Sequence, residues 1–220
     1  MGLAVADEIR VARRAVREIV DGMVINLGIG MPTLVVDFIP SDIHVLLQAE
    51  NGMLGYGPAP EEGAEDPYVT NAGGFPALQV AGASYFDSAL AFGMIRCGRV
   101  DMTILGALQV SEYGDLANWQ VPGRRIYGYG GAIELAQKAK KVVVATTHMS
   151  REGETKIVKE CTLPITARQC VDLIITDMAV IRVTSSGLVL EEVAAGRRVE
   201  EVVEATAAKL TVSRPLGSFE

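Results

Sequence analysis

The 220-residue sequence has few aromatic side chains, which make up 5 % of it, and only two histidines. Hydrophobic residues nevertheless reach 49 %, so we expect an aliphatic core, and this apolar content excludes an intrinsically disordered chain. No stretch of 18 consecutive apolar residues occurs, and no apolar block of signal-peptide length follows the charged N-terminal residues. The sequence therefore predicts no transmembrane helix, secretory signal or membrane anchor.

Basic residues are also scarce relative to acidic ones. Lysine and arginine together number 20, against 27 aspartates and glutamates, for a net charge of −7. A protein that binds nucleic acid through the phosphate backbone usually carries a basic excess on one face or arm. The charge balance therefore argues against a nucleic-acid binder.

Cysteine is limited to three residues, Cys97, Cys161 and Cys170, with no CxxC pair among them. The two histidines, His44 and His148, lie far from any cysteine in the sequence. This spacing predicts neither a zinc site nor a disulfide framework. We expect the three thiols to be small buried residues and the protein to be cytoplasmic, since unpaired thiols suit a reducing compartment.

Short apolar runs alternate with amphipathic segments along the whole chain. Apolar residues at helical spacing in 7–21, with arginines including Arg14 on the opposite side, predict an amphipathic helix. Continuous apolar runs separated by helices indicate a parallel sheet covered on both faces. The expected helices are 7–21, 32–38, 84–96, 132–139 and 199–210, and the expected strands are 23–27, 44–48, 101–105, 141–147, 172–176 and a hairpin of 179–184 with 187–192.

The fold class that follows is α/β, with a layered, mixed but mostly parallel sheet and helices on both faces. Nothing in the composition marks a linker, so we expect a single domain over 1–220. In such sheets, ligands bind at the carboxyl ends of the strands. Three loops after expected strands therefore matter most, and they are 26–32, 48–52 and 128–132.

The first of these loops contains Gly28 and Gly30 and opens onto a helix. It does not match the dinucleotide-binding pattern GxGxxG, because Thr33 stands where the third glycine would be and Pro32 intervenes. Its backbone N–H groups could hold an anion at the helix start. The residue pattern nevertheless favours a tight strand-to-helix turn without ligand contact.

The second loop carries Glu50 directly after a strand that we expect to be buried. A carboxylate there is costly unless it is paired or used. Asn51 and Gly52 predict a turn that presents Glu50 to a cleft or to the backbone N–H groups of the turn itself. The pattern alone leaves a functional and a purely structural role open.

The third loop has glycine at positions 128, 130 and 131 before an expected helix. Unhindered backbone N–H groups of this kind can stabilise an oxyanion, although close strand–helix packing would also require glycine. His44 lies in an apolar run and is expected in the core, whereas His148 follows a strand end without a nucleophile partner. GxSxG, P-loop and HExxH motifs are absent from the sequence, which leaves a carboxylate nucleophile with glycine donors as the remaining arrangement.

Several distinctive segments follow one another along nearly the whole chain. They are NLGIGMPTL at 26–34, ENGMLGYGP at 50–58, NAG at 71–73, GASYFDS at 82–88, MIR at 94–96, DMTILGA at 101–107, GDLANW at 114–119, GGA at 130–132, CTLP at 161–164 and IITD at 174–177. With these segments in this order, the sequence resembles the beta subunit of the class I, 3-oxoacid-type coenzyme A transferases.

The resemblance implies a role for two residues in particular. The glutamate of the family's Ser-Glu-Asn-Gly motif is the nucleophile, and it corresponds to Glu50. Ala49 replaces the serine, which puts a simple assignment to the succinyl-CoA:3-oxoacid branch in doubt. The glycine that donates a backbone N–H to the thioester oxyanion corresponds to Gly131, with Gly130 beside it.

Coenzyme A transfer through a glutamyl-CoA thioester on Glu50 is the activity that the resemblance implies. This chemistry needs no metal, nucleotide or redox cofactor, and coenzyme A is itself a substrate. Acyl-CoA and a carboxylic acid are the expected substrates, with neither nucleic acid nor membrane as a partner. The residues expected to bind substrate or coenzyme A are Asn26, Gly28, Gly30, Asn51, Gly52 and Gly130.

A second chain is also implied, because the family's alpha subunit contributes its own glycine-rich motif to the site. We therefore expect a heteromer of alpha and beta subunits, in the form α2β2. The main alternative is an acyl-CoA hydrolase of the same fold that uses the same glutamate, and a further one is a non-catalytic subunit that only binds coenzyme A. The acids exchanged are not readable from the sequence.

Overall fold

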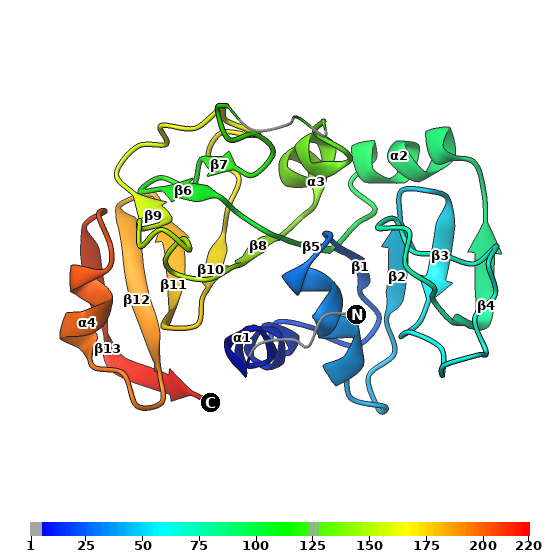
Figure 1. Cartoon of the computed structure of the whole chain (residues 1–220), viewed down its shortest axis with the longest axis horizontal. Helices are drawn as coiled ribbons and strands as arrows, with labels where there is room; N and C mark the ends of the chain where they lie inside the picture. Colours follow the sequence, from blue (N-terminus) through cyan, green and yellow to red (C-terminus); the bar gives the residue numbers. More distant parts are fainter. Residues whose placement is uncertain (1–5, 124–125, 127) are drawn as a thin grey trace.

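A computed structural model describes residues 6–123, 126 and 128–220. Within this part, one ten-stranded sheet runs through the molecule in the order β13-β12-β11-β10-β8-β5-β1-β2-β3-β4 (Figure 1). Its strands are β1 (Val24–Leu27), β2 (Leu46–Ala49), β3 (Met53–Tyr56), β4 (Gln79–Tyr85), β5 (Met102–Leu105), β8 (Val142–Ala145), β10 (Leu173–Ile175), β11 (Ala179–Thr184), β12 (Gly187–Ala194) and β13 (Leu210–Phe219).

The centre of the sheet is parallel, because β2, β1, β5, β8 and β10 all run in one direction. Antiparallel strands flank this centre: β3 and β4 on one side, and the β11–β12 hairpin on the other. The central strands are short, buried and rich in β-branched residues, as expected for strands covered on both faces. The predicted mixed, mostly parallel sheet is confirmed.

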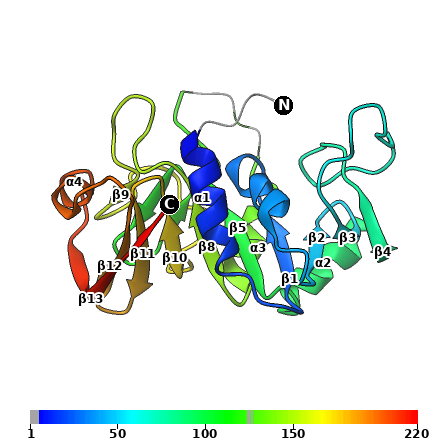
Figure 2. The same ribbon diagram turned by 90° about the horizontal axis from the view of Figure 1, so that it is seen from below.

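Helices cover both faces, as predicted. One face packs under α1 (Ala6–Val16) and the 3₁₀ segment η1 (Met31–Phe38), which lie across the near side of the sheet in Figure 2. The opposite face packs under α2 (Ser88–Arg96), α3 (Ala132–Lys138) and α4 (Val199–Glu204). Side chains alternate between these layers along each strand, so that Val143 joins one apolar cluster and Val144 the other.

The first helix differs from the prediction in its length and in one of its faces. It ends at Val16 instead of extending to 21. Arg14, which was expected on the solvent side, is buried. Its guanidinium donates two hydrogen bonds to Glu192, at 2.9 and 2.7 Å, and one to Glu18 at 2.7 Å. These bonds satisfy the buried charge and tie α1 to β12.

Other helix predictions need correction at their ends. The segment predicted as a helix over 32–38 is a 3₁₀ helix. The helix predicted over 84–96 begins at Ser88, because Asp87 Oδ1 accepts a hydrogen bond from the Leu90 N–H at 2.8 Å and caps it, whereas Ser84 lies in β4. The final helix ends at Glu204, and Leu210 begins β13.

The sequence analysis missed β3 and both edge strands, β4 and β13. It also treated 111–125 as a loop, although this range contains β7 (Leu116–Ala117) and the last residue of β6 (Gln109–Ser111). Together with β9 (Ile157–Val158), these strands form a small second sheet. Positions 124 and 125 lie outside the described residues. In the part of the chain that the structure describes, no helix has the length and apolar character needed to cross a membrane.

Candidate active site

A hollow of about 430 Å³ opens at the carboxyl ends of β1 and β5. The chain leaves β1 toward β2 on one side and leaves β5 toward β8 on the other, so the two connections diverge here. Such a switch point is where open α/β sheets place their ligands. This central hollow is lined by Gly28, Ile29, Glu50, Leu105, Gly106, Ala107, Leu108, Asn118, Trp119, Gly128, Tyr129, Gly130, Gly131, Ala132 and Leu135.

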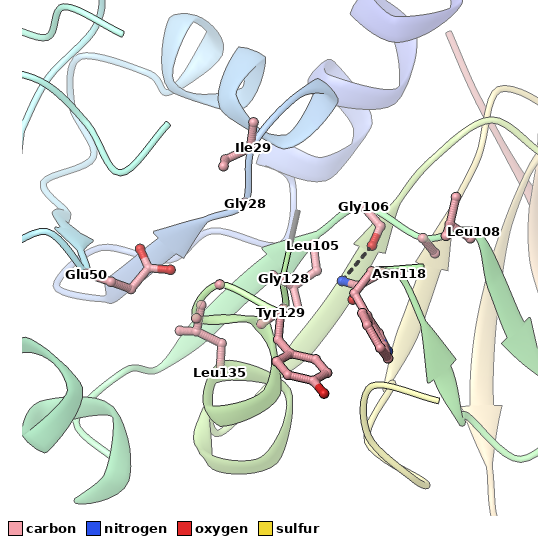
Figure 3. A pocket seen from close by; sticks show the side chains of 15 residues that line it. Gly28, Ile29, Glu50, Leu105, Gly106, Leu108, Asn118, Gly128, Tyr129 and Leu135 are labelled. Carbon is pink, nitrogen blue, oxygen red and sulfur yellow. Dashed lines mark hydrogen bonds between the residues drawn. The ribbon is translucent and has the colours of Figure 1, made fainter. Parts of the chain in front are cut away.

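Glu50 is the only carboxylate among the residues that line the hollow, and no lysine or arginine of the described chain lines it. It lies in the tight turn between β2 and β3, and its side chain is half-buried. Figure 3 shows it facing Tyr129 and Asn118 from the opposite side of the hollow. Burial and, next, the negative charge of Glu50 raise the pKa of Tyr56 above its usual range. Glu50 thus presents a half-buried carboxyl group to a largely apolar pocket.

Asn26 holds one oxygen of Glu50. This asparagine is fully buried on β1, and its Nδ2 donates to Glu50 Oε2 at 3.1 Å. A hydrogen bond to one carboxylate oxygen restricts the rotation of the group. Asn26 does not line the hollow. The structure therefore places it behind Glu50 and not at the surface where a substrate would lie.

Gly131 lies against the other oxygen of Glu50. A Cβ built on Gly131 would collide with Glu50 Oε1 and lie 3.0 Å from Glu50 Cδ. The backbone of Gly131 has φ −80°, which any residue adopts, so the need for glycine here comes from close approach and not from backbone strain. Glu50 Oε1 and Oε2 are therefore in different surroundings, one at the open hollow beside Gly131 and one bound by Asn26.

The other predicted site residues divide into two groups. Gly28 and Gly130 line the hollow. Gly30 and Asn51 do not, and the Asn51 amide instead donates to the Thr70 carbonyl oxygen at 2.9 Å. Gly52 is structural, because its φ of +112° favours glycine and a Cβ would collide with the Phe86 carbonyl oxygen.

Ala49, which replaces the serine of the family motif, points away from the hollow. Its side chain is buried in the apolar cluster beneath α1 and η1. Side chains alternate along β2, so Ala49 and Glu50 lie on opposite faces. The substitution therefore changes no atom of the hollow's wall.

Sequence reasoning about motifs missed the wall opposite Glu50. Trp119 and Tyr129 form a tilted aromatic pair with ring centroids 4.3 Å apart. Asn118 donates from Nδ2 to the Gly106 carbonyl oxygen at 3.1 Å, which joins two segments of the wall (Figure 3). These residues belong to the GDLANW and GxGGA segments, but no local pattern predicts that the two segments meet.

The environments of both histidines differ from the expectation. His44 is exposed, with 87 % of its side chain accessible, instead of lying in the core. His148 is fully buried and is absent from the lining of the hollow. Its Nδ1 and Nε2 each lie 2.9 Å from a threonine hydroxyl, those of Thr176 and Thr206, and burial lowers its pKa to about 4 against a weaker opposing effect of Asp177.

Among the cysteines, the expected burial is wrong for Cys97, which is exposed, while Cys161 and Cys170 are partly buried. Burial raises the pKa of Cys161 to about 11 and that of Cys170 to about 12. Over the described residues, no group of three or more histidine, cysteine, aspartate or glutamate side chains is arranged to hold a metal ion.

Comparison with known proteins identifies the family of this chain. The profile of the coenzyme A transferase family matches residues 9–205. A Bacillus subtilis protein described as a probable coenzyme A transferase, beta chain, is 53 % identical over 215 residues, covering 98 % of this chain and 99 % of its own. A mouse mitochondrial succinyl-CoA:3-ketoacid coenzyme A transferase, 2B, is 46 % identical over 206 residues, which are 93 % of this chain and 40 % of the mouse one.

Solved structures show the same fold. An Escherichia coli O157:H7 acyl-CoA transferase, crystallised as a thioester complex with CoA, superposes with a TM-score of 0.77 at 20 % identity, over 100 % of this chain and 44 % of that one. The decarboxylase AibA/AibB superposes with a TM-score of 0.72 at 20 % identity, over 99 % of this chain and 90 % of that one. At such identities the likeness concerns the fold alone.

The structure thus shows an α/β fold with a carboxylate and glycine-rich turns at its switch point. Given the family match over most of its length, this chain belongs to the coenzyme A transferase family, as a subunit of the beta type.

Proposed function

We propose that this chain is the catalytic-glutamate subunit of an enzyme that moves coenzyme A between an acyl-CoA and a free carboxylic acid. The observation that carries the proposal is the placement of Glu50, whose Oε1 faces the hollow beside Gly131 while Asn26 binds its Oε2 at 3.1 Å. A carboxylate held by one oxygen and free at the other is suited to nucleophilic attack.

In the first step, Glu50 Oε1 attacks the thioester carbonyl carbon of the acyl-CoA. The carbonyl oxygen becomes an oxyanion, which the Gly131 N–H stabilises, and collapse of the adduct expels the CoA thiolate. The product is an acyl-glutamyl anhydride. A donor placed where charge develops in the transition state lowers the barrier, and its loss typically costs about 10²–10³-fold in rate.

In the second step, the thiolate attacks the Glu50 carbonyl carbon and the acid leaves as its carboxylate, so that Glu50 becomes a CoA thioester. The acceptor carboxylate then reverses both steps. Each bond broken is replaced by one of similar energy, so the proposal includes no cofactor. Water would hydrolyse either intermediate, and the apolar wall with Trp119 and Tyr129 supports its exclusion.

The proposed partner is the family's alpha subunit, in an α2β2 heterotetramer whose active site lies between the chains. This rests on the names of the relatives, several of which are described as the beta chain of such an enzyme, and on the open side of the hollow beside Glu50. The substrates are an acyl-CoA and a short-chain or 3-oxo carboxylic acid, and the three free cysteines support a cytoplasmic location.

Covalent labelling of Glu50 tests the mechanism. Incubation of the assembled enzyme with acyl-CoA should add the mass of CoA to the peptide that contains Glu50, and borohydride should reduce this thioester and inactivate the enzyme. Glu50→Ala should abolish labelling and transfer. Glu50→Asp should nearly abolish transfer, because the shorter arm misplaces the nucleophile by about 1 Å. Full transfer by Glu50→Ala would exclude the mechanism.

The hydrolase alternative is separated by the fate of the acyl-CoA when no acceptor acid is present. A transferase should release at most one free acid per active site and then stop, whereas a hydrolase should turn over continuously. Adding an acceptor should then produce its CoA ester. A panel of donor and acceptor acids in the same assay identifies the substrates.

The requirement for the alpha subunit is tested by purifying this chain alone. It should be folded, by its circular dichroism, but inactive. Adding the cognate alpha chain should restore transfer and shift elution in size-exclusion chromatography. Ping-pong transfer by the isolated chain would contradict the heteromeric site.

A further inference from the structure

Gln48 occupies a sheet position where an apolar side chain would be usual. It is fully buried on β2, in register with Asn26 on β1, and it lies two residues before Glu50. Alternation along the strand directs Gln48 toward the same face as Glu50. A buried amide is costly unless its polar atoms are hydrogen-bonded, so the bonds of Gln48 account for its presence there.

Both ends of the Gln48 amide are engaged. Its Oε1 accepts a hydrogen bond from Asn26 Nδ2 at 2.8 Å, and its Nε2 donates to the Ala91 carbonyl oxygen of α2 at 3.4 Å. The main-chain oxygen of Gln48 accepts from the same Asn26 Nδ2 at 3.0 Å. Gln48 therefore connects the Asn26 amide with α2, the helix that covers this face of the sheet.

The Asn26 amide group is surrounded by three acceptors for its two hydrogens. Two of the acceptors belong to Gln48 and the third is Glu50 Oε2. A flipped amide would place Asn26 Oδ1 against three oxygen atoms, so the network allows one orientation. Asn26 Oδ1 itself has no hydrogen-bond partner among the described residues, so the anchoring comes from the side that faces Gln48 and Glu50.

We propose that Gln48 is a positioning residue for the nucleophile: it clamps the Asn26 amide so that Nδ2 stays on Glu50 Oε2 and Oε1 stays at the hollow. The inference rests on the proposed function, since it concerns the orientation of the glutamate that attacks. When Glu50 is esterified and its charge is lost, both Gln48 acceptors still hold Asn26 in place for the next step.

Two variants separate positioning from packing. Gln48→Met keeps the length of the side chain but removes the acceptor, so kcat should fall about 10-fold with little change in KM. Gln48→Glu places a second carboxylate on the nitrogen that binds Glu50. Like charge favours the neutral form of Glu50, so the acid limb of kcat/KM should move up by about one pH unit, and activity should recover at higher pH.

Thr103→Val is the matched control. Thr103 lies in register with Asn26 on β5, is fully buried, and its hydroxyl has no partner among the described residues. Valine has nearly its shape, so the control should retain the kcat and the pH profile of the wild type. Thermal unfolding of each assembled enzyme shows whether a variant is folded.

The experiment uses the complex with the alpha chain, after the wild type has been shown to transfer CoA and to label Glu50. A wild-type complex without transfer would count against the proposed function and not against Gln48. In a transferring complex, a lower kcat for Gln48→Met together with a pH-rescued Gln48→Glu supports the inference. A folded Gln48→Met variant with wild-type kcat, or a folded Gln48→Glu variant with an unshifted profile, overturns it.

Discussion

Two polar clusters follow parallel strands at the same edge of the sheet, and they differ in whether they face open space. The first cluster contains Asn26 on β1, Gln48 on β2 and Glu50 directly after β2. Glu50 lines a hollow of about 430 Å³. His148, Thr176 and Thr206 lie beyond β8 and β10, and all three are buried. Both clusters lie at the carboxyl ends of parallel strands, but only the first lines a hollow. A position at a strand end is therefore not sufficient to form a ligand-binding site.

The hydrogen bonds of the clusters differ in the same way. The Thr206 hydroxyl donates to the Val202 carbonyl oxygen at 2.7 Å, so it accepts from His148 Nε2. The Thr176 hydroxyl lies 2.9 Å from Nδ1 and also 3.2 Å from the Ala179 carbonyl oxygen. Both imidazole nitrogens therefore lie next to a buried hydroxyl group. Glu50 Oε2, in contrast, accepts a hydrogen bond from Asn26, whereas Oε1 lies against Gly131 and has no hydrogen bond among the described residues. The proposed function assigns the reaction to Glu50 Oε1, whereas the bonds of the histidine cluster serve the fold.

The largest expected effect tests the open cluster. Gly131→Ala should lower kcat by roughly 10²-fold or more, because its methyl group would displace Glu50 Oε1 and disturb the N–H proposed as the oxyanion donor. Steady-state kinetics of the assembled enzyme measures this. Gly93→Ala is the control, since its Cβ would meet no atom within 4 Å and α2 tolerates alanine well. Equal kcat values for the two variants would contradict the proposed role of Gly131 in the active site.

A smaller effect, on stability, is expected from the closed cluster. Burial lowers the pKa of His148 to about 4 in the folded chain, against 6.5 for an ordinary histidine. As the pH falls from about 6.5 toward 4, the unfolded chain binds a proton that the folded chain does not. The free energy of unfolding should therefore fall over this window, by up to about 3 kcal/mol from this residue.

Urea unfolding of the assembled enzyme between pH 7.5 and 4.5 measures this dependence. His148→Gln should be less stable at pH 7.5, because it loses a hydrogen bond of the cluster, but its stability should change less across the window. If wild type and variant lose stability in parallel, His148 is not the group responsible.

The smallest effect is expected at the other histidine. His44 is exposed and contacts Asp21 with Nδ1 3.5 Å from Oδ1. An exposed pair of this kind contributes little, so His44→Ala should change the free energy of unfolding by less than about 0.5 kcal/mol and leave kcat unchanged. If His44→Ala lowered the free energy of unfolding more than His148→Gln does, the expected difference between the exposed and the buried histidine would be wrong.

The central strands and the position of Glu50 could be predicted because both have local signals. Short β-branched runs mark β8 and β10, and a glutamate before Asn-Gly marks a turn. The pattern nevertheless left the role of Glu50 open, and only the resemblance to a family favoured the nucleophile. His44 was misplaced because β2 begins at Leu46, after the histidine, a boundary that the apolar run does not show.

The edge strands lacked such signals. β4 reads QVAGASY, with small residues in place of branched ones, and β13 contains Pro215 and Gly217. Both are irregular edge strands that pair on one side, where proline and glycine are tolerated. The Gln48–Asn26–Glu50 network was equally invisible, because it depends on the register between β1 and β2, which no local pattern specifies.

The two sides of the hollow are formed by different segments of the chain, which affects how the enzyme's choice of substrate can change during evolution. Glu50 and the residues that hydrogen-bond around it come from β1, β2 and the turn after β2, whereas the facing wall comes from segments 105–108, 118–119 and 128–130. Under the proposed function, substitutions at Leu108 or Tyr129 should change the size of the acyl group admitted while β1 and β2 stay as they are. Selection for a new acid would then act on one side of the cavity and leave Glu50 on the other side unchanged.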